Sequence, residues 1–280
     1  MAETRKKAGK PPLKLYWWRA QPNFGDAINR RIVARTAGRR VEWARLDSAD
    51  ILAIGSVLGF EATIRRLQGP MADHPLIWGS GLLSDPGDAL AGVRVGSRCL
   101  AVRGPLTAAR LPGFDGVLGD AGLLCPQVLP YDGLRAGVAY VPHHAQWKNP
   151  GRLEALAAEG LRIIDVRQAD PWDVVAQIAG CEMVLSASLH GLVVADAYGV
   201  PNIWVAASDW MATEGAFKFQ DYFASVGRKV DGAVSLAEGR RLAARAAVGF
   251  DCADGVARAQ RNLNAVLTAA MAAEAPAMQS

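Results

Sequence analysis

The sequence predicts an α/β fold made of two Rossmann-like domains that face each other across a cleft. Short apolar runs of strand length alternate with helical patterns, which is typical of parallel, doubly wound sheets. The alternation lapses between residues 126 and 137, where Pro, Gly and Asp are frequent, and then starts again. A chain of 280 residues has room for two domains of ordinary size.

The first half contains five predicted strands, at residues 13–18, 49–56, 75–80, 98–102 and 117–124. A helix is expected over residues 27–37, because Ile28, Ile32 and Val33 share one face of it. A short helix is expected to begin at Pro105, since proline suits the first turn of a helix.

The second half repeats this pattern and contains the most informative segment, residues 181–205. A buried strand, a polar turn, a helix from near His190 to Gly199 and a second strand form one βαβ unit. The other elements expected here are strands at 137–141 and 161–166 and helices at 151–158, 171–179, 236–248 and 256–273. We therefore predict a disordered basic tail at residues 1–12, an N-terminal Rossmann-like domain at 13–130, a C-terminal Rossmann-like domain at 131–235 and C-terminal helices at 236–280.

Charge and cysteine usage narrow the function classes. The net charge is +4, but most of the excess lies in the first ten residues, so we expect no nucleic-acid partner. The four cysteines form no CxxC pair, which favours reduced thiols. No apolar run approaches the roughly 20 residues of a membrane helix, and the N-terminus lacks a signal-peptide core. We expect a cytoplasmic protein whose contact with the inner face of a membrane is peripheral at most.

Several common site motifs are absent from the sequence. No glycine-rich dinucleotide or Walker loop follows the first strand, and no nucleophile elbow is present. The four histidines lack metal-ligand spacing, since His143 and His144 are adjacent. We expect neither a bound metal nor a cofactor.

Polar and ionisable residues instead recur where predicted strands end, and the carboxyl ends of parallel strands are where ligands bind. The start of the helix near His190 suits a phosphate or carboxylate, because free N–H groups and the positive end of the helix dipole lie there. His190 adds a group with an ordinary pKa of about 6.5. Each residue also has a simpler interpretation as a cap, a turn residue or a surface charge. The strand-end residues are Asn23, Asp26, Ser80, Arg103, Asp120, His143, His144, Ser186, Ser188 and His190, with Lys218 on a later aromatic segment.

Taken in order, these motifs resemble the polysaccharide pyruvyl transferase family. The matching segments lie at residues 23–26 (NFGD), 78–81 (WGSG), 102–107 (VRGPLT), 118–120 (LGD), 188–191 (SLHG) and 199–201 (GVP). Residues 217–222 (FKFQDY) resemble the exopolysaccharide ketal-pyruvate transferase branch. The resemblance spans about residues 13–226.

The resemblance implies a GT-B-like fold and an enzyme that takes the enolpyruvyl group of phosphoenolpyruvate. Such enzymes install pyruvate as a ketal across two hydroxyls of a sugar, usually O4 and O6. The implied partners are phosphoenolpyruvate as donor and an oligosaccharide acceptor, either lipid-linked or a free polymer.

The chemistry of such a transfer suggests roles for individual residues. His190 is the expected general acid or phosphate binder, and Asp26 or His144 the expected base. Trp17, Trp18, Trp147 and Trp210 are candidates for stacking on sugar rings, with packing as the alternative. The residues expected to bind substrate are Asn23, Gly25, Ser80, Arg103, His143, Ser186, Ser188, Gly191 and Lys218.

One position departs from the family pattern. Many members carry Arg two residues before the motif histidine, where this chain has Ser188. Either another cation, such as Arg103 or Lys218, binds the donor anion, or this branch handles the donor differently. Two rival functions remain open: a sugar-nucleotide-dependent glycosyltransferase, which would bind a nucleotide diphosphate, and a non-catalytic sugar-binding protein of polysaccharide assembly.

Overall fold

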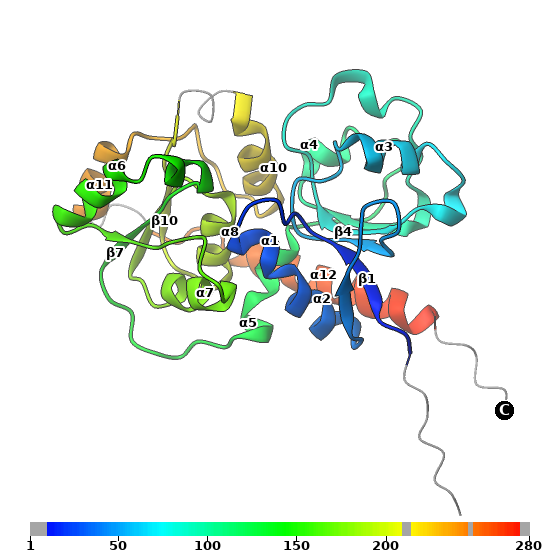
Figure 1. The fold of residues 1–280 in the computed structure, drawn as a ribbon, viewed down its shortest axis with the longest axis horizontal. Coiled ribbons are helices and arrows are strands. Elements are labelled where there is room, and N and C mark those ends of the chain that lie inside the picture. The colour runs from blue at the N-terminus through cyan, green and yellow to red at the C-terminus, as the bar shows by residue number, and fades with distance from the viewer. Residues whose placement is uncertain (1–9, 209–213, 246–248, 275–280) are drawn as a thin grey trace, which may run out of the picture.

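The computed structural model describes residues 10–208, 214–245 and 249–274, and within these residues the chain forms two parallel β-sheets flanked by helices (Figure 1). The first sheet has six strands in the order β2-β1-β3-β4-β5-β6, and the second has four in the order β10-β9-β7-β8. The predicted α/β class is therefore confirmed. Residues 1–9 of the predicted basic tail and Trp210 lie outside the described residues.

The first sheet is built from the N-terminal part of the chain. Its central strand β4 is buried along its whole length, as expected for a parallel strand covered on both faces. Its strands are β1 (Leu13–Tyr16), β2 (Val41–Trp43), β3 (Ile51–Leu52), β4 (Leu76–Ser80), β5 (Cys99–Val102) and β6 (Val117–Leu118). The α-helices of this part are α1 (Phe24–Ala27), α2 (Asn29–Ala37), α3 (Glu61–Leu67) and α4 (Pro105–Ala108).

The second sheet follows a short connecting helix, α5 (Cys125–Val128). Its strands are β7 (Val138–Val141), β8 (Arg162–Ile163), β9 (Met183–Ser186) and β10 (Asn202–Trp204). The remaining α-helices are α6 (Gly151–Ala158), α7 (Pro171–Ala179), α8 (Leu189–Ala197), α10 (Phe217–Ser225), α11 (Leu236–Ala244) and α12 (Ala253–Ala273). Helix α8 is buried almost all round, as its uniformly apolar sequence requires.

The structure corrects several predicted elements. The strand predicted over residues 117–124 ends at Leu118, because Gly119 adopts a positive φ of 153° and Asp120 then caps a 3-10 helix (Ala121–Leu124). Strand β2 and helix α3 were not predicted, since β2 has only three residues with one buried and α3 buries only Thr63 and Leu67. The aromatic segment, left unassigned from sequence, is helix α10.

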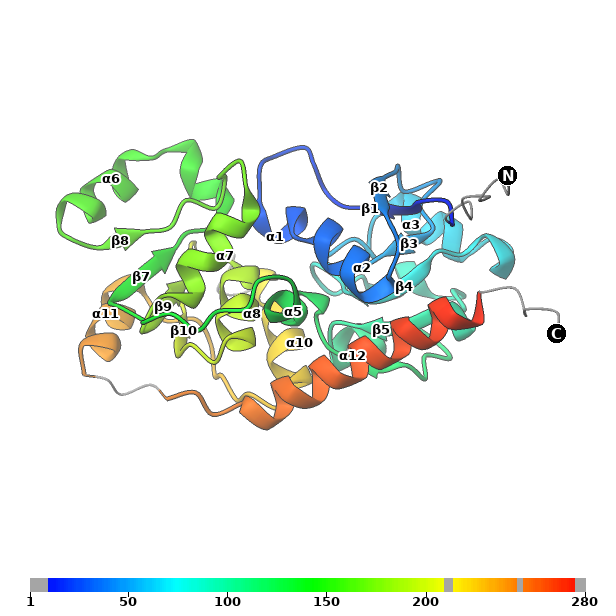
Figure 2. The ribbon, with the colours of Figure 1, turned by 90° about the horizontal axis from the view of Figure 1, so that it is seen from below.

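The two C-terminal helices pack in different places. Helix α11 packs against β9 of the second sheet, whereas α12 runs along the first sheet (Figure 2). The indole N–H of Trp78 in β4 donates a 2.9 Å hydrogen bond to the carbonyl of Leu263 in α12. Near the end of the helix, Arg39 and Glu274 form an ion pair of 3.1 Å. The last helix therefore covers the sheet that the first half of the chain builds.

The parts around the two sheets share one apolar core. Phe24 and Ile28, which follow β1, belong to the same buried cluster as Trp172 and Val175 of α7. Polar contacts join them as well: the Thr107 hydroxyl donates to an Asp221 carboxylate oxygen over 2.6 Å, which ties α4 to α10. No helix in the described segments combines the length and apolar character needed to cross a bilayer.

Candidate active site

The turn between β9 and α8 is organised by Ser186. Its hydroxyl donates to the Ser188 carbonyl over 2.8 Å and accepts from the Ser188 N–H over 3.0 Å. A β-carbon at Gly191 would lie 2.2 Å from this hydroxyl oxygen, so only glycine fits there. Ser188 then occupies the N-cap position, and His190 follows in the first turn. Ser186 and Gly191 therefore shape the start of the helix.

The start of α1 holds the first acidic group of the site. Asn23 is the N-cap and accepts a hydrogen bond from the Gly25 N–H, while its amide donates to a carboxylate oxygen of Asp26 over 2.6 Å. Asp26 is only 8% exposed. Gly25 between them packs against the His190 ring. The turn after β1 is thereby held against the turn after β9.

Behind these turns lies a buried group of charges. Arg103 Nε is 3.4 Å from Asp120 Oδ2, and His190 Nε2 is 3.8 Å from the same oxygen. None of these three atoms has a hydrogen-bond partner among the described residues. The two terminal nitrogens of Arg103 donate to the Leu82 carbonyl and the Ser56 hydroxyl. Arg103 is fully buried and supports the site from beneath.

A cavity of about 140 Å³ opens between these segments. It is lined from the first sheet by residues that follow β1, β3 and β4, and from the second by residues that follow β7 and β9. Lys218 of α10 also reaches it. The residues lining it are Trp18, Asn23, Asp26, Gly55, Ser56, Val57, Phe60, Leu83, His143, His144, Ser188, Leu189, His190 and Lys218.

The cavity brings together the three residues predicted to be catalytic, His190, Asp26 and His144. Among those predicted to bind substrate, it also contains Asn23, His143, Ser188 and Lys218. The remaining predicted binding residues do not line it. Ser80 donates its hydroxyl to the Gly55 carbonyl, Arg103 and Ser186 are engaged as described, and Gly25 and Gly191 provide close packing. These five residues hold the segments that line the cavity in place through hydrogen bonds and close packing.

Burial shifts the pKa values of His190 and Asp26 in opposite directions. Burial, reinforced by the positive charges of Arg103 and Lys218, lowers the pKa of His190 to about 3. Burial also raises the pKa of Asp26 to about 7, against the opposing hydrogen bond from Asn23. The expectation that His190 titrates near neutral pH is therefore wrong. At pH 7 the imidazole is therefore neutral, and of the two groups Asp26 is the one with a pKa near neutrality.

The remaining ionisable groups of the cavity follow the same rule. Burial lowers the pKa of Lys218 to about 8, with Arg103 adding to the effect and Asp26 opposing it. Burial also lowers the pKa of His143 to about 3 and shifts that of His144 in the same direction. The free cavity thus offers one ammonium group, three neutral imidazoles and one carboxyl group poised near neutrality. Among the described residues, no three His, Cys, Asp or Glu side chains converge as metal ligands.

Some features of the site were not recognised in the sequence. The sequence places Asp120 at the end of a predicted strand but indicates no role for it, whereas in the structure its carboxylate lies between Arg103 and His190. Phe60 and Leu83, which form an apolar wall, carry no motif. The LGD segment at residues 118–120 is the signal that could have identified Asp120.

Two comparisons with known proteins bear on the family of this chain. Residues 100–209 match the family model described as polysaccharide pyruvyl transferase, a segment that contains Arg103, Asp120 and His190. The chain is also 31% identical over 235 residues to the succinoglycan biosynthesis protein ExoV of Rhizobium meliloti. The chain belongs to the polysaccharide pyruvyl transferase family.

The matches to both relatives are partial. The alignment with ExoV covers 77% of this chain and 65% of ExoV. The uncharacterized protein L143 of Acanthamoeba polyphaga mimivirus is 26% identical over 148 residues, covering 50% of this chain and 52% of L143. The chain thus spans less than two thirds of the length of either relative.

Proposed function

We propose that this chain transfers the pyruvyl group of phosphoenolpyruvate to a sugar of an exopolysaccharide repeat unit, forming a ketal across two hydroxyls, the 4,6-ketal being the expected product. The observation that best supports this reaction is the pairing of Asp26, whose pKa is about 7, with Lys218 and His190 in one cavity. A carboxyl group with this pKa suits proton transfer near neutral pH. Family membership supports the choice of donor and acceptor class.

The donor brings about three negative charges, so its site needs cations and N–H donors. Lys218 and the first turn of α8 supply these groups from two sides of the cavity. Arg103 contributes its charge from the protein interior, since it does not line the cavity. This arrangement accounts for Ser188 where many relatives carry Arg: in our proposal Lys218 provides the charge.

The proton balance of the reaction needs only one residue that donates a proton and then regains it. Protonation of the methylene carbon of phosphoenolpyruvate makes C2 electrophilic, one sugar hydroxyl adds to C2, phosphate leaves, and the second hydroxyl closes the ring. The two hydroxyls release two protons, of which the methyl group keeps one and phosphate the other. Asp26 donates the first proton in its protonated form and is reprotonated from the hydroxyl. Neutral His190 accepts a hydrogen bond from a reacting hydroxyl through its one unprotonated ring nitrogen.

The presence of a bound trianion favours these protonation states. Its field raises the pKa of Asp26 further, so the acid form predominates during the first step. The same field raises the pKa of Lys218 and keeps it charged. We also propose that the two sheets correspond to two domains of a GT-B-like fold, with the cavity at their junction.

The proposal is tested by incubating the full chain with phosphoenolpyruvate and candidate oligosaccharides. ExoV is named for succinoglycan biosynthesis, so a succinoglycan-type oligosaccharide is the first acceptor to try. The expected result is phosphate release together with an acceptor mass gain that matches a pyruvyl ketal, both lost in Asp26→Asn. Tight binding of a nucleotide diphosphate without any use of phosphoenolpyruvate would instead identify a glycosyltransferase.

A further inference from the structure

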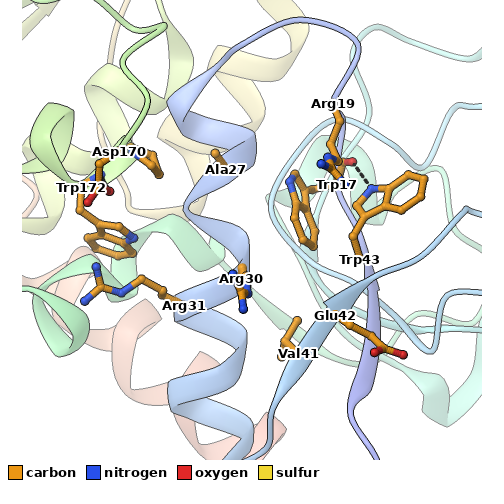
Figure 3. Close-up of a pocket in the computed structure, with 11 residues that line it drawn as sticks. Trp17, Arg19, Ala27, Arg30, Arg31, Val41, Glu42, Trp43, Asp170 and Trp172 are labelled. Atoms are coloured by element: carbon orange, nitrogen blue, oxygen red, sulfur yellow. Dashed lines mark hydrogen bonds between the residues drawn. The ribbon is translucent and has the colours of Figure 1, made fainter.

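A second hollow, of about 590 Å³, lies beside the cavity and has no part in the proposed chemistry (Figure 3). Its walls carry an unusual combination of three arginines and three tryptophans. We call it the arginine groove and define it by Trp17, Arg19, Arg30, Arg31, Trp43 and Trp172. One wall comes from β2 and the loop after β1, and the other from the end of α1, from α2 and from the start of α7.

Aromatic rings, and not carboxylates, contact the arginines of the groove. The guanidinium carbon of Arg19 is 5.2 Å from the ring centre of Trp43, and that of Arg31 is 4.8 Å from the ring of Trp172. A guanidinium stacked in this way uses its face and leaves the N–H donors on its edge free. The guanidinium groups of Arg19, Arg30 and Arg31 make no hydrogen bond or ion pair to any residue that the structure describes.

The two acidic residues of the groove do not neutralise these cations. Asp170 accepts a hydrogen bond from the Trp172 N–H and so serves as the N-cap of α7. The Glu42 carboxylate points away from Arg30 (Figure 3). A neighbouring hollow of about 590 Å³ shares Arg30 and Arg31 and adds Arg40 to the positively charged surface.

The groove and the cavity are immediate neighbours along the chain. Trp17 lines the groove and Trp18 the cavity, and in the same way Ala27 lines the groove and Asp26 the cavity. Trp43 is 39% exposed and offers a ring on which a sugar can stack. A ligand seated in the groove therefore contacts chain segments whose neighbouring residues line the cavity.

We propose that the arginine groove binds an acidic oligosaccharide, one with carboxylates on its sugar rings, as the remote part of the acceptor; this inference rests on the proposed function. Arginines lie on both walls, and Trp43 exposes part of its ring whereas Trp172 is only 5% exposed, so the fitting ligand presents negative charges along its length and a sugar ring to Trp43. A chain of uronic acid sugars has this character, whereas a glycosyl diphosphate concentrates its charge at one end. Each arginine can bind a carboxylate in a bidentate manner.

The test is calorimetry of the full chain with tetragalacturonic acid and with its methyl ester, which removes the charge and keeps the sugar rings. The acid is expected to bind at least about tenfold more tightly than the ester, and more weakly as salt is added. Arg30→Gln and Arg31→Gln should each weaken binding of the acid roughly tenfold, the value expected for one charge-assisted hydrogen bond. Arg35→Gln, on the same helix but outside the groove, is the matched control and should leave binding unchanged.

The inference is overturned if acid and ester bind equally, if neither binds, or if Arg35→Gln has the effect of Arg30→Gln. Binding to phosphatidylglycerol vesicles in place of the acid would assign the groove to a membrane surface and also overturn it. The two proposals can be tested separately, because Asp26→Asn should abolish transfer and leave tetragalacturonate binding intact. Arginine-dependent binding without transfer to any acceptor would contradict the function and not the groove. Transfer without such binding would contradict the groove alone.

Discussion

The backbone of Gly25 packs so closely on His190 that a β-carbon added at Gly25 would lie 2.0 Å from the imidazole Nδ1. The same atom would lie 2.4 Å from Cγ and 2.7 Å from Cβ of the histidine, so rotation of the ring alone could not relieve the clash. Gly25 belongs to α1, after β1, and His190 to α8, after β9. This contact therefore fixes the separation between the carboxyl ends of the two sheets at the cavity.

Gly25→Ala should push α1 and α8 apart and reduce the proposed pyruvyl transfer. Misplacement of reacting groups by about 1 Å can cost roughly a hundredfold in rate, and we expect a loss of that order. Phosphate release with saturating phosphoenolpyruvate measures it. Gly151→Ala is the matched control, because no atom lies within 4 Å of a β-carbon at that helical position. A wild-type rate for Gly25→Ala would show that the separation of the two helices is unimportant.

The stability of the protein should depend on pH through Asp26. Its pKa is raised from 3.8 to about 7 in the folded state, chiefly by burial. The folded state therefore binds this proton more tightly than the unfolded state, so the stabilisation is complete below about pH 4 and is lost as the pH rises through 7. Relative to Asp26→Asn, the wild type should lose on the order of 4 kcal/mol of unfolding free energy between about pH 4 and pH 8.

Urea denaturation of both proteins at several pH values provides this comparison. Subtracting the unfolding free energy of Asp26→Asn from that of the wild type removes the contributions of His143 and His190. Their pKa values are lowered, but both histidines titrate equally in the two proteins. A difference that stays constant with pH would mean that the Asp26 carboxyl group is not buried as described.

The convergence of site residues was predictable from the sequence, because it follows from topology. Parallel strands bring their carboxyl ends to one edge, so polar residues directly after predicted strands had to gather there. Asn23, Asp26, His143, Ser188 and His190 were found in this way and line one cavity. Helix α8 was recognised from its apolar run and from the stop at Gly199, which has the expected positive φ of 65°.

The sequence could not show which of these residues would be buried and by what. Arg103 resembles a binding residue in the sequence, but its guanidinium is enclosed by Leu82, Ser56 and Asp120, which are distant from one another along the chain. The pKa values of His190 and Asp26 depend on the same tertiary enclosure. The path of α12 along the first sheet likewise depends on Leu263 meeting Trp78, a contact between residues 185 positions apart.

Lys218 should contribute mainly to binding of the donor. Lys218→Gln removes the ammonium group that lines the cavity and should raise the KM for phosphoenolpyruvate roughly tenfold or more, the value of one charge-assisted hydrogen bond. The kcat should change less, because in the proposed mechanism Asp26 performs the proton transfer. Lys229→Gln, an exposed lysine shortly after the same helix, serves as control. If kcat falls and KM is unchanged, Lys218 acts in the chemical step instead.

The buried Arg103–Asp120 pair should be far more important for stability than an exposed pair of the same type. Arg103→Met leaves the Asp120 carboxylate buried without its cation, and we expect a loss of about 3–5 kcal/mol in unfolding free energy. Arg65→Met breaks the pair with Glu61, whose side chains are 74% and 87% exposed, and should cost about 1 kcal/mol or less.

A second change separates the charge effect from the loss of packing. Adding Asp120→Asn to Arg103→Met removes the unpaired charge and keeps an oxygen to accept the Gly122 N–H, so part of the lost stability should return. Urea denaturation of the single and double variants gives the coupling energy. If the double variant is less stable than Arg103→Met, Arg103 stabilises the site through its hydrogen bonds to Leu82 and Ser56 and not through the charge of Asp120.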